Sequence, residues 1–187
     1  MTKRASTETP ILDIVAERWS PRSFDPTFTV TAADLAAPFE AARWAPSANN
    51  RQPWSFIVGY RGDDTFATIL ETLKGYNPTW APTASALIVA CANTAGDKDT
   101  RNPWAEYDLG QSVAYFSLQA ASNGLFVHQI GGFNTDAAAE KFGVESPWVP
   151  VTVIAVGKPG DPAALPEELA AREVAPRERK AVSDFVH

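Results

Sequence analysis

Apolar residues recur three and four positions apart along much of the chain, and this spacing predicts amphipathic helices. Thr9, Thr31 and the Asp63–Asp64 pair are suitable N-caps, and Pro10 suits a first helical position. Gly124 and Gly143 are suitable helix ends. Helices are therefore expected at about 10–20, 32–44, 64–73, 102–123, 135–142 and 167–172.

Short apolar runs lie between these helices and predict strands at about 54–60, 84–92, 125–130 and 149–156. The run at 84–92 is nearly all apolar, which is typical of a strand that is buried on both faces. The segments 75–82 and 93–101 are expected to be loops. Because helices and strands alternate irregularly, we expect a three-layer arrangement with a mixed sheet rather than a regular βαβ array.

Length, composition and net charge indicate how many domains the chain forms and which partners are unsuitable for it. The 187 residues fit a single domain over 1–187 with a full core, preceded by a flexible lead-in over 1–8. A net charge of −6 and a pI near 4.9 argue against nucleic acid or an anionic membrane as the main partner. The N-terminal segment lacks the apolar core of a signal peptide, and no apolar run approaches the roughly 20 residues of a membrane span. We therefore expect a soluble, cytoplasmic protein.

Polar and bulky residues alternate after the first predicted helix. In an extended backbone, Arg18, Ser20 and Arg22 would point one way, and Trp19 and Pro21 the other. Two guanidinium groups and a hydroxyl suit a phosphate or a carboxylate, because arginine offers paired donors to such oxyanions. A solvated face with surface ion pairs, each contributing about 0–1 kcal/mol, is an equally weighted alternative at this point.

A second polar segment, residues 45–54 with the sequence APSANNRQPW, joins a helix to a strand. Its two prolines restrict the backbone, and its small residues let another surface approach closely. Its amide and guanidinium groups suit a flat heteroaromatic ring that carries both donors and acceptors. An ordinary helix-to-strand loop is the alternative, and the segment by itself favours that alternative.

Several familiar catalytic motifs are missing from the sequence. It contains no GxGxxG after a strand, no GxxxxGK[ST] and no GxSxG. His128 and His187 lie far apart, and the one cysteine, Cys91, supports neither a disulfide framework nor a zinc site. We therefore assign no metal site and no catalytic residue. If the protein is an enzyme, a bound cofactor is expected to carry the chemistry.

Several short motifs nevertheless occur together in a specific order. They are Arg18-x-Ser20-x-Arg22-x-Phe24, the run at 45–54, Asn77 with Trp80, Asp108-x-Gly110, Gly131-Gly132-Phe133 and Arg177-x-Arg179-Lys180. In order and spacing they resemble the FMN-dependent nitroreductase family, from about residue 11 to the end of the chain.

The resemblance implies an α+β three-layer sandwich with a mixed, mainly antiparallel central sheet flanked by helices. It also implies an intertwined homodimer with FMN at the interface, and a C-terminal extension over 158–187 that reaches the flavin phosphate. Trp19 stands where a second basic residue is common in the family. The implied FMN-binding residues are Arg18, Trp19, Ser20, Arg22, Asn77, Gly131, Gly132, Arg177 and Arg179, with Lys180 as an alternative to either tail arginine, and, from the other subunit, Pro46, Ser47, Ala48 and Asn50.

The activity implied by the resemblance is a ping-pong transfer of hydride. NADH or NADPH would reduce the flavin at N5, beside the backbone of the two glycines, and a nitroaromatic, quinone or similar flat small molecule would then be reduced in the same slot. Arg22 would stabilise the negative charge of the reduced flavin. A specialised dehydrogenation or dehalogenation, and a flavin-binding protein without turnover, are the alternatives. Candidates for lining the substrate pocket are Tyr76, Trp80, Trp104, Tyr107 and His128.

Overall fold

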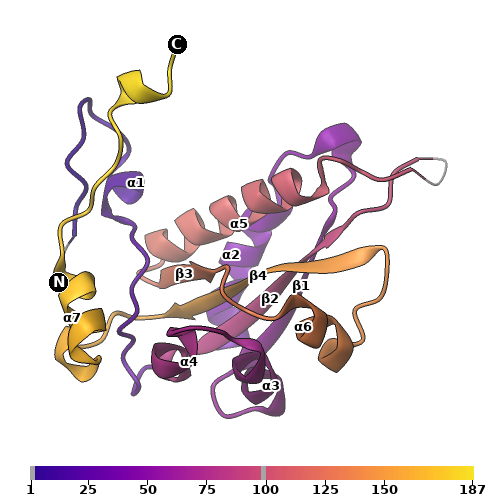
Figure 1. Ribbon diagram of the computed structural model, residues 1–187. Helices are drawn as coiled ribbons and strands as arrows, with labels where there is room; N and C mark the ends of the chain where they lie inside the picture. The colour runs from indigo at the N-terminus through magenta and orange to yellow at the C-terminus, as the bar shows by residue number, and fades with distance from the viewer. Residues whose placement is uncertain (1–2, 98–99) are drawn as a thin grey trace.

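An antiparallel sheet forms the centre of the protein in a computed structural model that describes residues 3–97 and 100–187 (Figure 1). Its strands are β1 (Trp54–Tyr60), β2 (Ala86–Asn93), β3 (Phe126–Ile130) and β4 (Trp148–Gly157), in the order β1-β2-β4-β3. Every pairing between these strands is antiparallel. The sheet of the described residues is therefore antiparallel throughout, which agrees with the expected mainly antiparallel sheet and shows no parallel pairing within it.

Helices cover both faces of this sheet, so the three-layer α+β arrangement is confirmed (Figure 1). One face carries α3 (Asp64–Thr72), α4 (Asn77–Trp80) and α6 (Thr135–Phe142), and the other carries α2 (Ala32–Arg43) and α5 (Ala105–Ser122). Along β2, Leu87 and Val89 enter the first core and Ile88 the second, and all three are fully buried. Burial of each such side chain contributes roughly 1.5–3 kcal/mol, which explains why this strand is apolar on both faces.

Local capping interactions set several helix ends where the sequence predicts them. Thr31 and Asp34 form a reciprocal capping box at the start of α2. The side chain of Asp63 accepts a hydrogen bond from the N–H of Phe66 at the start of α3. Gly143, with φ 62°, ends α6 in the left-handed conformation that suits glycine.

The first helix is shorter than predicted. α1 comprises only Asp13–Glu17, although Thr9 and Pro10 predict an earlier start. Leu12 occupies the N-cap position without a capping side chain, and Asp13 is held by an ion pair with Arg4 at 2.6 Å. The local Thr9–Pro10 signal therefore does not set the start of this helix.

The segment 75–82 is not the loop that the sequence predicts, because it contains α4 and the 3-10 helix η2 (Ala81–Thr83). Trp80 is buried in the core beside Phe24, and this packing orders the segment. The longest helix, α5, begins at Ala105 rather than at residue 102. None of the helices in residues 3–97 and 100–187, α5 included, is long and apolar enough to cross a membrane.

The N-terminal and C-terminal segments of the described chain run side by side (Figure 1). After η3 (Pro162–Ala164) and α7 (Glu167–Val174), residues 177–187, which include η4 (Val182–Asp184), run along the N-terminal segment and away from the sheet. The N–H of Val182 donates to the Glu8 carboxylate at 3.4 Å. We call residues 3–12 together with 177–187 the terminal arm.

Candidate functional site

The segment that follows α1 alternates in burial, as its sequence pattern predicts. Its backbone is extended at Arg18, and Trp19 and Pro21 are buried. Trp19 packs edge-on against Phe126 of β3, with the ring centroids 6.1 Å apart. The buried side chains therefore hold the segment against the sheet and leave three polar side chains partly exposed: Arg18, Ser20 and Arg22.

These three side chains line a cleft of about 150 Å³ together with residues from both ends of the chain. Among the described residues, six cationic side chains and one acidic side chain line it: Lys3, Arg18, Arg22, Arg172, Arg177, Arg179 and Glu173. We call it the cationic cleft. It brings together the predicted phosphate-binding residues of the N-terminal segment and of the tail.

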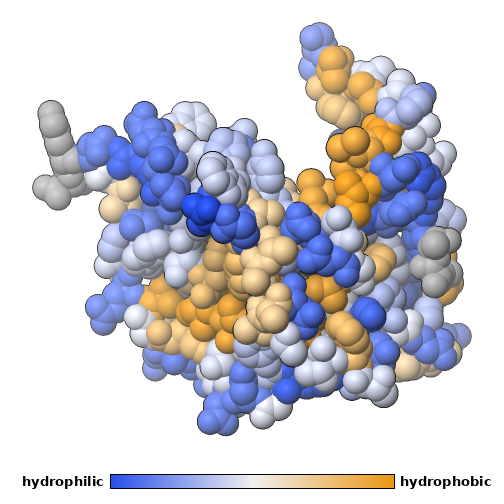
Figure 2. Space-filling model, turned by 180° about the vertical axis from the view of Figure 1, so that it is seen from behind, coloured by the Kyte–Doolittle hydropathy of each residue, from blue (hydrophilic) through white to orange (hydrophobic). Residues whose placement is uncertain are grey.

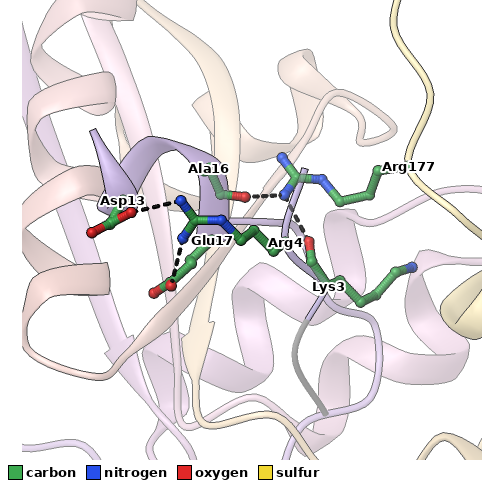
Figure 3. A network of polar contacts seen from close by, with 6 residues as sticks. All are labelled: Lys3, Arg4, Asp13, Ala16, Glu17 and Arg177. Atoms are coloured by element: carbon green, nitrogen blue, oxygen red, sulfur yellow. Dashed lines mark hydrogen bonds and ion pairs between the residues drawn. The ribbon is translucent and has the colours of Figure 1, made fainter. Parts of the chain in front are cut away.

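Arg177 fastens the tail to the rest of the cleft (Figure 3). Its Nη1 donates to the backbone carbonyls of Lys3 at 2.9 Å and Ala16 at 2.6 Å. Arg4, beside Lys3, forms ion pairs of 2.6 and 2.9 Å with two acidic side chains of α1. Lys3, which belongs to the expected lead-in, is thus part of the framework of the cleft, whereas Arg4 lies outside its lining.

The cationic groups of the cleft repel one another, and this repulsion is visible in the pKa values of two arginines. Burial lowers the pKa of Arg18, and the charges of the two tail arginines lower it further. Burial also lowers the pKa of Arg22, with the charge of Arg172 adding to the shift and that of Glu173 opposing it. Since arginine remains protonated in proteins, these charges persist at neutral pH. An anion in the cleft would offset the repulsion between them.

Glu173 is a site residue that the sequence analysis missed. Its side chain is 1% exposed, and its carboxylate accepts hydrogen bonds from the backbone N–H groups of Arg22 and Ser23. The available signal is that Glu173 follows Leu169 by four residues and so shares the buried face of α7. A glutamate is almost never fully buried unless it is paired.

A second group of predicted residues gathers at the end of β3. The Nδ2 of Asn77 donates to the Gly132 carbonyl at 3.0 Å. A Cβ added to Gly132 would lie 2.6 Å from that Nδ2, whereas a Cβ added to Gly131 would meet open space. His128, three residues before Gly131, contacts the Pro21 carbonyl at 2.8 Å through Nδ1. The glycine pair therefore lies roughly 10 Å along the strand from the segment that bears Arg18 and Arg22.

The third predicted group, Pro46, Ser47, Ala48 and Asn50, is not brought to the cationic cleft within one chain. Its turn contains the 3-10 helix η1 (Ala48–Asn50), and the Ala48 N–H donates to Asp108 at 3.0 Å near the start of α5. The cationic cleft adjoins β3, which follows the opposite end of α5. With 18 residues, this helix is roughly 27 Å long.

The same turn has an unusual backbone. Asn49, Asn50 and Gln52 have φ values of 53°, 53° and 50°. Asparagine tolerates this left-handed region, but other side chains adopt it seldom. The Gln52 N–H donates to the Ser47 hydroxyl at 3.0 Å, which helps to hold the turn in this shape. The strain therefore falls mainly on Gln52, where such a conformation costs about 1–3 kcal/mol, and strained positions of this kind cluster at functional sites. The turn is thus a candidate binding element.

The aromatic candidates for a substrate pocket fall into two classes. Trp80 is a core residue, since it stacks with Phe24 at 6.2 Å and lies 4.6 Å from His128 between ring centroids. Burial lowers the pKa of His128 to about 4, so its ring is neutral at pH 7 and donates from Nδ1 to the Pro21 carbonyl. The side chains that remain exposed are Tyr76, Trp104 and Tyr107.

Comparisons with known proteins identify the family of this chain. The model of the Nitroreductase family matches residues 15–73 and 61–158. An uncharacterized 15.4 kDa protein of Mycolicibacterium smegmatis is 39% identical over 135 residues, which cover 68% of this chain and 90% of the relative. The oxygen-insensitive NAD(P)H nitroreductase of Salmonella typhimurium is 30% identical over 107 residues, which cover 56% of this chain and 47% of that enzyme.

A solved structure extends the agreement to the whole chain. A crystal structure described as an oxidoreductase containing FMN matches with a TM-score of 0.93 at 28% identity, over 100% of this chain and 96% of the other. The fold, the order of the motifs and the family match lead to one conclusion. This chain belongs to the nitroreductase family.

Proposed function

We propose that the protein is an FMN-dependent oxidoreductase that transfers hydride from NADH or NADPH to a nitroaromatic, a quinone or a similar flat acceptor. The observation that carries the proposal is the cationic cleft, which arginines from both ends of the chain line together with Ser20. Similarity to a structure that contains FMN and to the NAD(P)H nitroreductase of Salmonella typhimurium also supports this function.

The cleft suits the phosphate of FMN. Arg18, Arg22 and Arg179 carry planar donors that match phosphate oxygens, and Ser20 adds a hydroxyl. Each charge-assisted hydrogen bond contributes about 1.5–3 kcal/mol, against about 0–1 kcal/mol for a surface ion pair. Burial lowers the pKa of Arg18 and the charges of Arg177 and Arg179 lower it further, and a bound phosphate would offset that repulsion. Several such bonds would hold FMN without a covalent link.

The end of β3 suits the flavin ring. Open space lies where a Cβ of Gly131 would project, so a flat ring can approach the backbone there. The hydrogen bond from Asn77 to the Gly132 carbonyl fixes the amide beside the glycine pair. The cleft and the glycine pair lie along one strand, so a single extended cofactor can span both.

We include a homodimer in the proposal for two reasons: one set of predicted FMN-binding residues lies away from the cleft of its own chain, and the terminal arm exposes apolar side chains. The turn at 46–50 lies far from the cationic cleft, and a second copy would bring it to the flavin. The terminal arm also exposes apolar side chains, seen along the arm in Figure 2, that include Ile11, Leu12 and Phe185. Exposed apolar surface of this kind commonly marks an interface between proteins.

The chemistry divides between cofactor and protein. Bound FMN would supply the redox chemistry, because it can take up a hydride from a nicotinamide and give it to an acceptor in a ping-pong cycle. The protein would bind and orient the cofactor. The arginines would hold its phosphate, and Asn77 and the two glycines would hold the edge of its ring.

Anaerobic mixing of the flavin-loaded protein with NADH or NADPH tests the proposal. We expect the visible absorbance of the flavin to bleach rapidly and to return when a quinone or a nitroaromatic is added. A protein that binds FMN but stays yellow with both nicotinamides would be a flavin-binding protein without turnover. That outcome would reject the proposed activity.

A further inference from the structure

Glu173 joins three segments that are distant in the sequence. Its Oε1 accepts hydrogen bonds from the backbone N–H groups of Arg22 at 2.9 Å and Ser23 at 3.0 Å, and its Oε2 contacts the Arg22 N–H at 3.1 Å. Its own backbone carbonyl accepts a hydrogen bond of 2.6 Å from the Nζ of Lys3. We call residues 18–23, which bear Arg18 and Arg22, the arginine segment. One residue of α7 thus contacts both the arginine segment and the N-terminal segment.

These contacts bear mainly on the backbone of the arginine segment. The guanidinium of Arg22 approaches the Glu173 carboxylate only to 4.0 Å, whereas the backbone contacts are about 1 Å shorter. The carboxylate therefore fixes the position of the main chain and leaves the guanidinium donors of Arg22 free to meet a ligand in the cleft. A neutral or apolar residue would not accept both N–H groups in this way unless it carried an oxygen at the same place.

The presence of a buried carboxylate in an anion-binding cleft has to be explained. Its negative charge works against the binding of a phosphate, and burial of a charge is costly unless it is paired. Here the carboxylate is 1% exposed, accepts two backbone N–H groups and faces the charges of Lys3 and Arg22. Its benefit to binding must therefore come from geometry rather than from its charge.

We propose that Glu173 is a positioning residue that sets the phosphate end of the flavin site by holding the backbone at Arg22 and Ser23. The proposal rests on the proposed function, because it takes the ligand of the cationic cleft to be the FMN phosphate. Glu173 does not touch that phosphate. It fixes the direction from which Ser20 and Arg22 meet it.

Riboflavin separates this role from a general structural one, because it carries the same ring as FMN but no phosphate. The dissociation constants of FMN and riboflavin are to be measured by fluorescence titration for the wild type, Glu173→Ala and Glu173→Gln. Ser112→Ala is a matched control, since Ser112 is a fully buried polar residue whose hydroxyl bonds the Ala42 carbonyl between α5 and α2. Thermal unfolding of each variant reports its stability.

We expect Glu173→Ala to weaken FMN binding about tenfold or more and riboflavin binding by less than about threefold. Glu173→Gln keeps an oxygen at the Oε1 position, so its FMN affinity should stay within about threefold of the wild type or rise. Ser112→Ala should leave the ratio of the two affinities unchanged. If Glu173→Ala does not fold, Glu173→Asp replaces it: the shorter carboxylate keeps the charge but retracts from both N–H groups, and the same selective loss is expected.

Two results would overturn the inference. Equal losses for FMN and riboflavin would mean that Glu173 supports only the fold, and a Gln variant as weak as the Ala variant would mean that backbone positioning is not its role. Failure of the proposed function looks different, because the wild type itself would then bind FMN no more tightly than riboflavin.

Discussion

Arg177 donates a hydrogen bond of 2.6 Å to the Ala16 carbonyl, and through it the C-terminal tail is fastened to α1. The same nitrogen donates to the Lys3 carbonyl at 2.9 Å. The cationic cleft is therefore a product of both ends of the chain. Its shape depends on contacts between segments more than on either segment alone.

Arg177→Ala should weaken FMN binding by about 10–100-fold, because the substitution removes one charge and releases the tail. Arg4→Ala is the control: its ion pairs with Asp13 and Glu17 are exposed and contribute about 0–1 kcal/mol each. Fluorescence titration with FMN measures both. Similar losses in the two variants would count against a specific role for Arg177.

Ending the chain after Pro176 should leave a protein that is purified largely without flavin. The deletion removes Arg177, Arg179 and Lys180 from the end of the chain. A chain that ends after Asp184 keeps these basic residues and should retain FMN. The flavin content of each protein after gel filtration is the measurement, and wild-type flavin content in the shorter chain would refute the role assigned to the tail.

The two neighbouring glycines should respond differently to alanine. Gly131→Ala places its Cβ in open space, so its free energy of unfolding should change by no more than about 0.5 kcal/mol, while FMN binding or reduction is impaired. Gly132→Ala forces Asn77 to move, because the new Cβ would lie 2.6 Å from Nδ2, and the lost hydrogen bond should cost about 1 kcal/mol. Urea unfolding without flavin and stopped-flow reduction with flavin distinguish these effects.

His128 should make the stability of the flavin-free protein depend on pH. Burial lowers its pKa from 6.5 to about 4 in the folded state, so the unfolded state takes up a proton first as the pH falls. Stability is therefore full above about pH 6.5 and should decrease by up to roughly 3 kcal/mol as the pH falls to 4.

The variant His128→Asn keeps an N–H donor for the Pro21 carbonyl but does not titrate. Between pH 6.5 and 4.5, its free energy of unfolding, measured in urea, should depend less on pH than that of the wild type. The pKa of Glu40 is lowered from 4.5 to about 2, so Glu40 makes stability depend on pH only below about pH 4.5 and does not interfere in this window. An unchanged slope in the variant would assign the pH dependence to other groups.

The sequence predicts those parts of the fold that depend on neighbours along the chain. The Thr31 cap, the Asp63 cap and the Gly143 helix end are each determined within a few residues, and all three are confirmed. The structure adds Asp34, which completes a capping box with Thr31. The alternation around Trp19 is likewise local and is confirmed. The early start of α1 at Pro10 is wrong, because the helix begins at Asp13 and the Thr9–Pro10 signal is not used.

The site was harder to predict, because its geometry depends on distant segments. Nothing near Glu173 in the sequence shows that its carboxylate meets Arg22 and Ser23, which lie about 150 residues away. Trp80 was a candidate pocket residue, but packing against Phe24 makes it a core residue. The role of the turn at 46–50 depends on a second copy of the chain, and it stays a prediction.

The central claim is that two copies of this chain together bind FMN through the cationic cleft. Its most direct test is the visible spectrum of the purified protein, recorded together with its mass by light scattering during gel filtration. We predict a yellow dimer with one FMN per chain. A colourless monomer that takes up no added FMN would contradict the account.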